Sequence, residues 1–214
     1  VFFVVFNNDI VQVYDVENFL FLNVLGLRFD SSAIAYSNLL FIFFSVLPLS
    51  FLRVKKHQFF SALLYFTSNS IFLILNFIDF AYYRFNLNRM MGNFLESISN
   101  ENNKLKLIFH FLFQHSNLVL LFLLFLFIWI GLYRLVKVKE EKIENNKVYY
   151  LSSIFGILIS SALIVMMARG GDFSKSTRPI TLIDAMDNLS KPVHSDVVLN
   201  TSFTIIRTWG KNSF

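Results

Sequence analysis

The segment Leu118–Tyr133 reads LVLLFLLFLFIWIGLY and contains no charged residue. A helix of a soluble protein needs a polar face toward water, and this segment has none along its length. The hydrocarbon core of a bilayer accommodates about 20 predominantly apolar residues as one helix. We therefore predict a transmembrane helix over Leu107–Tyr133, in preference to a buried core helix of a large soluble protein.

Three further segments are long and apolar enough to cross a membrane: Ser32–Leu52, Phe59–Phe80 and Tyr149–Ala168. Val1–Phe6 (VFFVVF) is apolar but too short to span. We interpret it as the end of a helix whose beginning is missing, with a short strand as the alternative. The predicted fold is all-α: a polytopic helical membrane bundle of four visible spans plus the remnant of a first, within an N-terminally truncated domain of residues 1–168.

The composition agrees with a membrane protein. Of the 214 residues, 55% are hydrophobic and only 15% are charged, whereas soluble domains carry roughly 25% charged residues. This balance argues against a soluble enzyme and against a disordered chain. The absence of cysteine excludes a disulfide framework, a thiolate nucleophile and a cysteine-held metal. The net charge of +5 does not indicate nucleic-acid binding, because no basic face interleaved with aromatic residues stands on a soluble domain.

Basic residues concentrate in two of the connections between predicted spans, and Lys and Arg accumulate in cytoplasmic loops. These residues are Arg53, Lys55 and Lys56 in the first connection, and Arg134, Lys137, Lys139, Lys142 and Lys147 in the second. We therefore expect a multi-pass protein of the cell membrane, with the stretch Asn7–Ser31 and the C-terminal residues 169–214 on the extracytoplasmic side.

Two apolar stretches outside the spans, Val16–Leu25 and Arg89–Ile98, are predicted to be helices in the membrane interface, with buried re-entrant segments as the alternative. Residues 169–214 are expected to form an extracytoplasmic helical linker. Gly170-Gly171 is a typical helix stop, and Thr181 followed by Asp184 indicates a helix start. The pattern of Asp196–Arg207 fits a strand or a helix capped at Asn200-Thr201.

Charged and polar residues cluster where the predicted spans meet the extracytoplasmic boundary, and charges near the hydrocarbon are functional hypotheses. The cluster consists of Arg28, Asp30, Asn76, Asp79, Arg84 and Arg89. We predict a lipid-headgroup site, in which the arginines bind a phosphate and the acids and the amide orient them. The alternative is that pairs such as Arg28–Asp79 or Asp30–Arg84 only fasten loops. Arg169 and Arg178 are expected to dock the linker onto the extracytoplasmic surface.

Other polar residues give weaker signals. His110 and His115 are five residues apart and no carboxylate stands three or four residues from either, so no metal site is predicted. Thr67–Ser70 in the middle of a span is typical of residues that join helices, and a transport path is the minority interpretation. No catalytic motif for a nucleophile or a phosphate-binding loop is present.

Four phrases, taken together and in order, resemble the N-terminal membrane region of the lipoteichoic acid synthase-like family, the membrane-anchored sulfatase and phosphoglycerol transferase proteins of the alkaline phosphatase superfamily. The resemblance covers nearly the whole chain. The phrases are GLRFDSSAIAY from Gly26; NFIDFAYYRF from Asn76 with Arg89; Arg169-Gly170-Gly171 with Thr177-Arg178-Pro179-Ile180; and Leu199–Phe203 running to Arg207-Thr208, with Ser202 where the family phrase has Pro.

The resemblance implies five spans, an outside linker and a large extracytoplasmic catalytic domain that follows this chain. That domain would hold a Thr nucleophile and a divalent metal, commonly manganese. The whole protein would transfer or hydrolyse a phospho- or sulfo-ester, such as glycerol phosphate from an anionic phospholipid donor. The alternatives are a stand-alone small membrane transporter or channel, and an intramembrane acyltransferase that uses His110 or His115.

Overall fold

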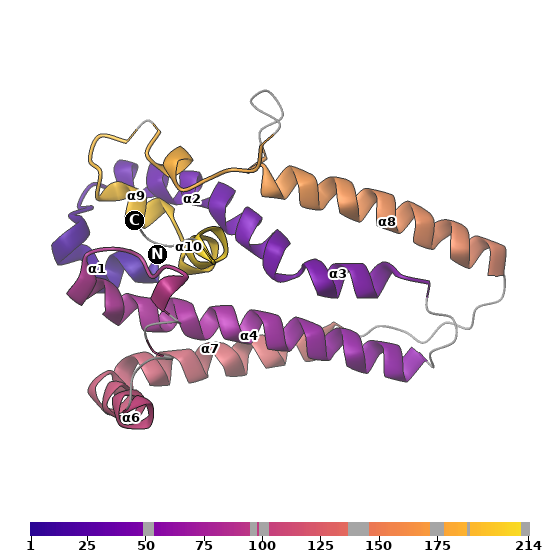
Figure 1. Cartoon of the computed structure of the whole chain (residues 1–214), viewed down its shortest axis with the longest axis horizontal. Coiled ribbons are helices and arrows are strands. Elements are labelled where there is room, and N and C mark those ends of the chain that lie inside the picture. Colours follow the sequence, from indigo (N-terminus) through magenta and orange to yellow (C-terminus); the bar gives the residue numbers. More distant parts are fainter. Residues whose placement is uncertain are drawn as a thin grey trace.

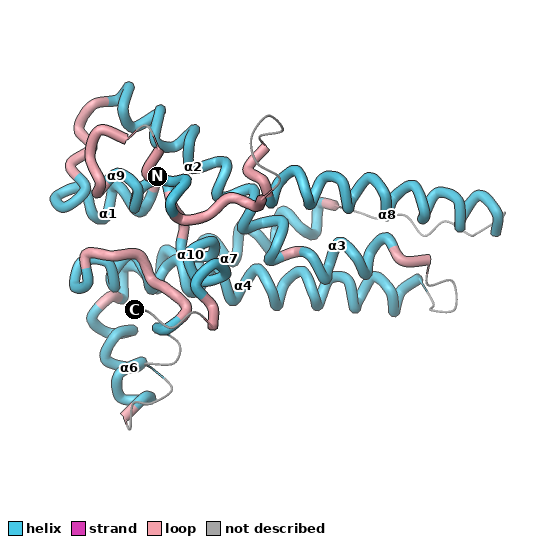
Figure 2. The backbone as a smooth tube through the Cα atoms, turned by 45° about the horizontal axis from the view of Figure 1, so that its top comes forward, coloured by secondary structure: helices cyan, strands magenta, loops and turns pink. Residues whose placement is uncertain are grey.

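The computed structural model describes residues 1–48, 54–94, 98, 103–136, 146–171, 178–187 and 189–210. Every regular element among them is helical (Figure 1), and the backbone tube contains helices and loops (Figure 2). The all-α prediction is therefore confirmed for the described residues.

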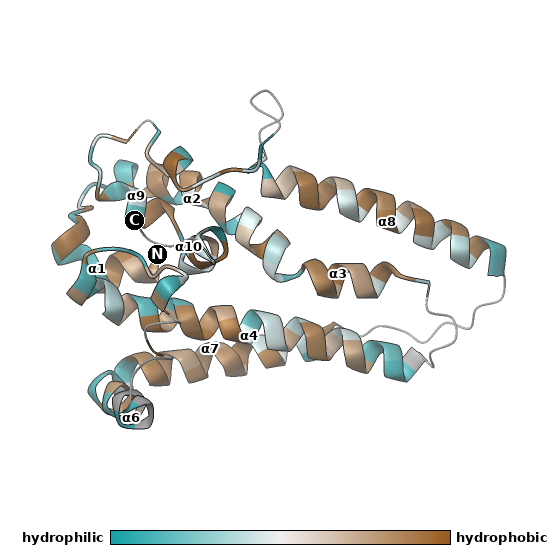
Figure 3. Cartoon of the chain, in the orientation of Figure 1, coloured by the Kyte–Doolittle hydropathy of each residue, from teal (hydrophilic) through white to brown (hydrophobic). Residues whose placement is uncertain are grey.

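Three helices are long and apolar enough to cross a membrane: α4 (Val54–Asn86), α7 (Ser116–Leu135) and α8 (Asn146–Ala168). A fourth span is possible if the bent pair α2 (Val16–Ser37) and α3 (Leu39–Val46) is counted as one. Apolar colours predominate along α3, α7 and α8 (Figure 3). These helices support the prediction of a multi-pass membrane protein.

The segment predicted as the first span, Ser32–Leu52, is bent by 56° at Asn38, where α2 ends and α3 begins. Asn38 and Asn69 of α4 exchange amide hydrogen bonds of 2.6 and 3.1 Å, and Ser68 Oγ donates to the carbonyl oxygen of Ser37. At the bend, α4 thus provides a hydrogen-bond donor for the carbonyl oxygen of Ser37 and a side-chain partner for Asn38. Residues 49–52 of the predicted span lie outside the described residues.

The segment predicted as the third span, Leu107–Tyr133, is two helices. Helix α6 (Lys104–Gln114) ends at His115, whose backbone is non-helical (φ −112°, ψ 38°), and α7 begins at Ser116. The carbonyl oxygen of His115 accepts from the amides of Leu118 and Val119, so the residue also starts the next helix. The spanning helix therefore begins at Ser116, and the prediction of one helix from Leu107 was wrong.

Helix α4 is longer than the predicted span Phe59–Phe80. Its 33 residues give a length of about 50 Å at the usual rise per residue, which exceeds a hydrocarbon thickness of about 30 Å. The end of α4 that carries Asp79 and Arg84 therefore has room to extend beyond the bilayer. α8 ends at Ala168, as predicted.

The N-terminal residues form helices where the sequence suggested a remnant and an outside loop. Phe2–Phe6 belong to α1 (Phe2–Val11), which is kinked at Asn7 and has Val1 as its N-cap residue, so the alternative of a strand does not hold. Val16–Leu25, predicted as a separate interfacial helix, is the first part of the long α2, whose N-cap Asp15 accepts from the Asn18 amide at 3.1 Å.

The stretch Arg89–Ile98 is not an interfacial helix from its start. α4 ends at Asn86 and Leu87 has a positive φ of 54°, after which the chain runs without helix through Met91. Arg89 and Met90 are buried, which fits the alternative of a buried segment. Asn93, Phe94 and Ile98 are helical, and residues 95–97 lie outside the described residues.

The C-terminal residues fold back onto the ends of α2 and α4. Gly170 and Gly171 have φ values of 71° and 77°, and their amides bond the carbonyl oxygens of Met167 and Met166, which confirms the predicted helix stop. Asp184 accepts from the amide and hydroxyl of Thr181, but the helix that follows is a single 3-10 turn, η1 (Ile183–Ala185).

Asp196–Arg207, ambiguous in the sequence, falls within two helices, α9 (His194–Val198) and α10 (Thr201–Thr208). Asn200 caps α10 through a 2.7 Å bond from the Phe203 amide, as its sequence position suggested. The amide of Gly92 donates to Thr208 Oγ1 at 2.7 Å, and a Cβ at residue 92 would lie 2.8 Å from Trp209 Cα. This close approach requires glycine.

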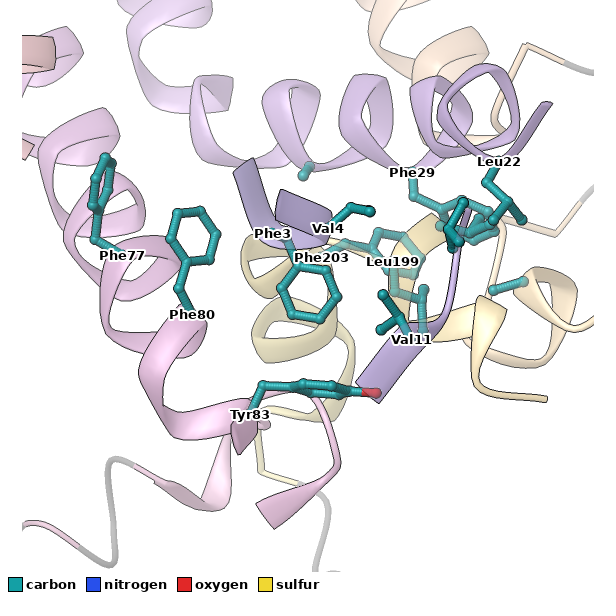
Figure 4. Close-up of a cluster of buried hydrophobic side chains, with 14 of the residues drawn as sticks. Phe3, Val4, Val11, Leu22, Phe29, Phe77, Phe80, Tyr83, Leu199 and Phe203 are labelled. Carbon is teal, nitrogen blue, oxygen red and sulfur yellow. The ribbon is translucent and has the colours of Figure 1, made fainter. Parts of the chain in front are cut away.

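We call the assembly of residues 2–33, 75–92 and 194–209 the cap. Its core combines side chains from the N-terminal, middle and C-terminal parts of the chain (Figure 4). The Phe3 ring packs edge-on against Tyr83, with centroids 4.8 Å apart, and Phe29 packs in the same manner against Phe203 at 5.1 Å. Residues 1–168 and 169–214, divided in the sequence as membrane domain and linker, thus share one core.

The cap lies at one end of the molecule, and the first turns of α4 and α8 lie at the other (Figure 1). α7 runs from the cap side toward that end and stops beside the middle of α4, where Tyr133 packs against Tyr65 and Phe66. The first turns of α4 and α8 contain Lys55, Lys56 and Lys147, which therefore lie at the end opposite the cap, and Arg134 follows Tyr133 at the end of α7. The remaining residues of the predicted cytoplasmic loops, Arg53, Lys137, Lys139 and Lys142, lie outside the described residues. Which end faces the cytoplasm stays a prediction.

We predict that Asn69→Ala lowers the free energy of unfolding by about 1 kcal/mol, because it removes the side-chain hydrogen bonds with Asn38 that join two helices. The measurement is equilibrium unfolding in mixed detergent micelles. Ser70→Ala, the next residue of the same helix, is the control and is expected to leave stability unchanged. Equal losses in the two variants would contradict a specific role of the Asn38–Asn69 pair.

Candidate functional site

The centre of the cap is the carboxylate of Asp79, which is fully buried on α4. Its Oδ1 accepts from the Met90 amide at 2.7 Å, and its Oδ2 accepts from Arg89 Nη1 at 2.5 Å and from Thr201 Oγ1 at 2.8 Å. A buried carboxylate is costly unless it is paired and hydrogen-bonded. Asp79 meets this requirement with donors from the loop after α4 and from α10, so it joins these segments.

The guanidinium of Arg89 uses its other nitrogens on the C-terminal segment. Nε donates to the carbonyl oxygen of Leu199 at 3.1 Å, and Nη2 donates to the same oxygen. The ring centroid of Phe3 lies 3.8 Å from the guanidinium carbon, a cation–π contact with the N-terminal helix. Arg89 is only 6% exposed. Through Leu199 and Phe3 it contacts both the C-terminal segment and the N-terminal helix.

Two side chains predicted for headgroup binding also contact the C-terminal segment. Asn76 Nδ2 donates to Ser202 Oγ at 2.9 Å, in addition to its own helix at Phe72 O. Asn200 Nδ2 donates to Asp30 Oδ1 at 2.5 Å. These bonds link α4 and α2 with the start of α10.

A third link joins Tyr83 of α4 to Asp196 of α9, where the tyrosine hydroxyl donates to Oδ2 at 2.9 Å. Burial raises the pKa of the Asp196 carboxyl, while the bond from Tyr83 and the positive charge of Arg89 act in the opposite direction. Sequence reasoning missed this pair, because a tyrosine and an acid more than a hundred residues apart give no local signal.

The other two arginines of the predicted cluster bind elsewhere. Arg28 is half-buried and its Nε donates to Gly170 O at 3.3 Å, at the turn after α8. Arg84 forms an exposed ion pair with Asp9 at 2.6 Å and donates to the carbonyl oxygen of Phe6. The ion pairs of the cap thus differ from the two that the sequence suggested, and they favour the alternative in which charged residues fasten segments together.

The residues expected to dock the linker lie near its start. Arg178 donates to Asp184 Oδ1 at 3.2 Å within the linker and is largely exposed. The backbone amide of Arg169 bonds to the last turn of α8. Arg28 of α2 donates to Gly170 in this turn. Docking of the linker by Arg169 and Arg178 stays a prediction.

A pocket of about 270 Å³ opens between α1, α2, α4 and residues 197–200. Its walls include the aromatic rings of Phe77, Phe80 and Phe125. Its polar lining residues are Asn23, Asp30, Asn76, Arg89 and Asn200. We call it the polar pocket. The structure therefore brings together Asp30, Asn76 and Arg89 of the predicted cluster, whereas Arg28, Asp79 and Arg84 do not line this pocket.

The polar pocket offers hydrogen-bond acceptors. Within the described residues, no donor reaches Oδ2 of Asp30 or Oδ1 of Asn76, although the other polar atom of each side chain is engaged. The positive charge of Arg89 is balanced by Asp79. A group bound here would therefore be one that donates hydrogen bonds, such as a hydroxyl.

Thr201 is a further site residue that the sequence signalled only as part of a helix cap. Its hydroxyl donates to Asp79 at 2.8 Å, and that of Thr204, one turn on, donates to Met90 O at 2.6 Å. Both threonines are fully buried. The two threonines are three residues apart and therefore lie on one face of α10. In the sequence, this spacing of two hydroxyl residues is the pattern that could have indicated a polar contact.

Comparisons of this chain with family models, with curated proteins and with solved structures find no match. The resemblance to the lipoteichoic acid synthase-like family therefore stays a prediction.

We predict that Asp79→Asn lowers the free energy of unfolding by about 3–5 kcal/mol, because Arg89 then remains buried without its counter-charge. The control is Asp9→Asn, which removes the exposed partner of Arg84 and should cost at most about 1 kcal/mol. Unfolding in mixed micelles, followed by circular dichroism, provides the comparison. If the two substitutions cost the same, Asp79 does not organise the cap.

Proposed function

We propose that this chain is the membrane-anchoring domain of an extracytoplasmic sulfatase-like phosphotransferase or hydrolase of the lipoteichoic acid synthase-like kind. In this proposal the catalytic domain follows the linker and carries the nucleophile and a divalent metal such as manganese. The membrane domain holds that domain at the surface and presents the lipid donor.

The observation that carries the proposal is the burial of the C-terminal segment in the cap. Leu199 and Thr201 bond directly to Arg89 and Asp79, and Phe203 is fully buried against Phe29. A segment held in this way is a rigid base for a domain attached to it. Residues 197–200 of this segment also line the polar pocket, which supports a ligand site close to the segment that leads to the proposed domain.

The chemistry of the polar pocket supports a lipid donor with a hydroxylated headgroup. The acceptors Asp30 Oδ2 and Asn76 Oδ1 suit the hydroxyl groups of a glycerol headgroup, as in phosphatidylglycerol. The aromatic walls suit the glycerol backbone and the first carbons of the chains.

The alternative, a transporter or channel, requires polar groups along a path through the bilayer. Asn38, Ser68 and Asn69 are polar groups in the middle of the helices, and they bond to one another and to the backbone. None of them lines the polar pocket. This arrangement favours the anchoring proposal over transport.

The orientation is tested with a reporter enzyme that is active only outside the cytoplasm. Fused after Phe214, it should be active, because the proposal places the C-terminal segment on the extracytoplasmic side. Fused after Val136, between α7 and α8, the same reporter should be inactive. Activity in the opposite pattern would overturn the proposal.

The headgroup site is tested by Asn76→Leu, which should reduce the preferential retention of phosphatidylglycerol over phosphatidylcholine about three- to tenfold, the effect of losing roughly one hydrogen bond. Chains extracted from nanodiscs containing both lipids are analysed by mass spectrometry. The matched control is Asn86→Leu, because Asn86 lies on the same helix, makes the same bond to its preceding turn and is exposed outside the polar pocket. Unchanged preference in a folded Asn76→Leu protein would refute the headgroup site.

A further inference from the structure

A second and larger cavity, of about 610 Å³, lies between α4, α6 and α7. We call it the apolar groove. Its lining surface is wholly apolar, and its volume is in the range of small-molecule sites. Among its lining residues are Ile78, Ala81, Phe111, Leu118, Phe122 and Leu123.

The break at His115 creates the groove. A continuous helix from Lys104 to Leu135 would carry α6 onward along the axis of α7. Because the backbone leaves the helical conformation at His115, α6 turns away from α7 (Figure 2), and Phe111 and Leu112 of α6 become one wall of the space beside α4.

The lining chemistry limits what the groove can hold. A loop of polypeptide would bring backbone amide and carbonyl groups that need hydrogen-bond partners, and the groove offers none. A polar small molecule would meet the same deficit. A hydrocarbon chain has no such need, and lipid chains surround the spanning helix α7, which forms one wall.

The groove also adjoins a polar site. Phe77 lines both the apolar groove and the polar pocket, and its ring packs against Phe122 at a centroid distance of 5.5 Å. The apolar groove and the polar pocket are therefore neighbours that share the side chain of Phe77. This arrangement suits a lipid, which has an apolar chain and a polar headgroup. We propose that the apolar groove binds one acyl chain of a membrane phospholipid at a defined site with a stoichiometry of one.

This inference does not rest on the proposed enzymatic role. Its test uses a lipid with a choline headgroup, so that failure of the acyl-chain site can be distinguished from failure of the proposed function. The purified chain in detergent is titrated with phosphatidylcholine that carries a diazirine near the end of one acyl chain, then irradiated. Peptide mass spectrometry locates the adducts. We expect labelling of the Leu118–Leu123 stretch to saturate at about one lipid per chain, while labelling at Phe127, which is 78% exposed on α7, rises without saturation.

The matched variants are Leu123→Trp and Leu132→Trp. Both leucines lie on α7 and both are more than half exposed, but only Leu123 lines the apolar groove. A tryptophan at residue 123 fills the groove, so saturable labelling should fall at least fivefold, whereas the change at residue 132 should leave it intact. Labelling of the wild-type chain that never saturates, or that is the same in the Leu123→Trp protein, would overturn the proposal.

Discussion

The buried ion pair between Asp79 and Arg89 is the interaction on which the cap depends. Neither group can be taken out of water alone, because an uncompensated buried charge costs several kcal/mol. The structure meets this condition by bringing three separate segments to one carboxylate and one guanidinium. The loop after α4 and the residues before and at the start of α10 therefore meet at this pair, and the N-terminal helix packs onto it through the ring of Phe3.

The membrane helices are held by weaker means. α7 and α8 are apolar on nearly all sides and bury little of their surface within the chain, which is expected where lipid replaces water and the hydrophobic effect no longer drives helices together. Helix contacts there depend on aromatic packing, such as Phe66 with Trp129 and Tyr133, and on the reciprocal side-chain hydrogen bonds between Asn38 and Asn69. The specificity of the fold thus resides mainly in the cap.

The same division explains which predictions from the sequence held. The end of α8 and the capping of α10 by Asn200 were predicted because glycine pairs and cap residues act within a few positions of the chain. The breaks at Asn38 and His115 were not predicted, since a polar residue in an apolar segment is compatible with a straight helix. For Asn38 the deciding contact, Asn69, lies on another helix.

The sequence by itself determined that the chain is helical, rich in segments able to cross a membrane, and polar at one end, because hydropathy and capping are local properties. It also identified Asp30, Asn76 and Arg89, which share one pocket. Only the tertiary structure decided that Asp79 pairs with Arg89 and Asp9 with Arg84, and that Asp196 accepts a hydrogen bond from Tyr83. A charged side chain has several candidate partners of opposite sign, and the choice among them depends on which segments the packed core brings within hydrogen-bond distance.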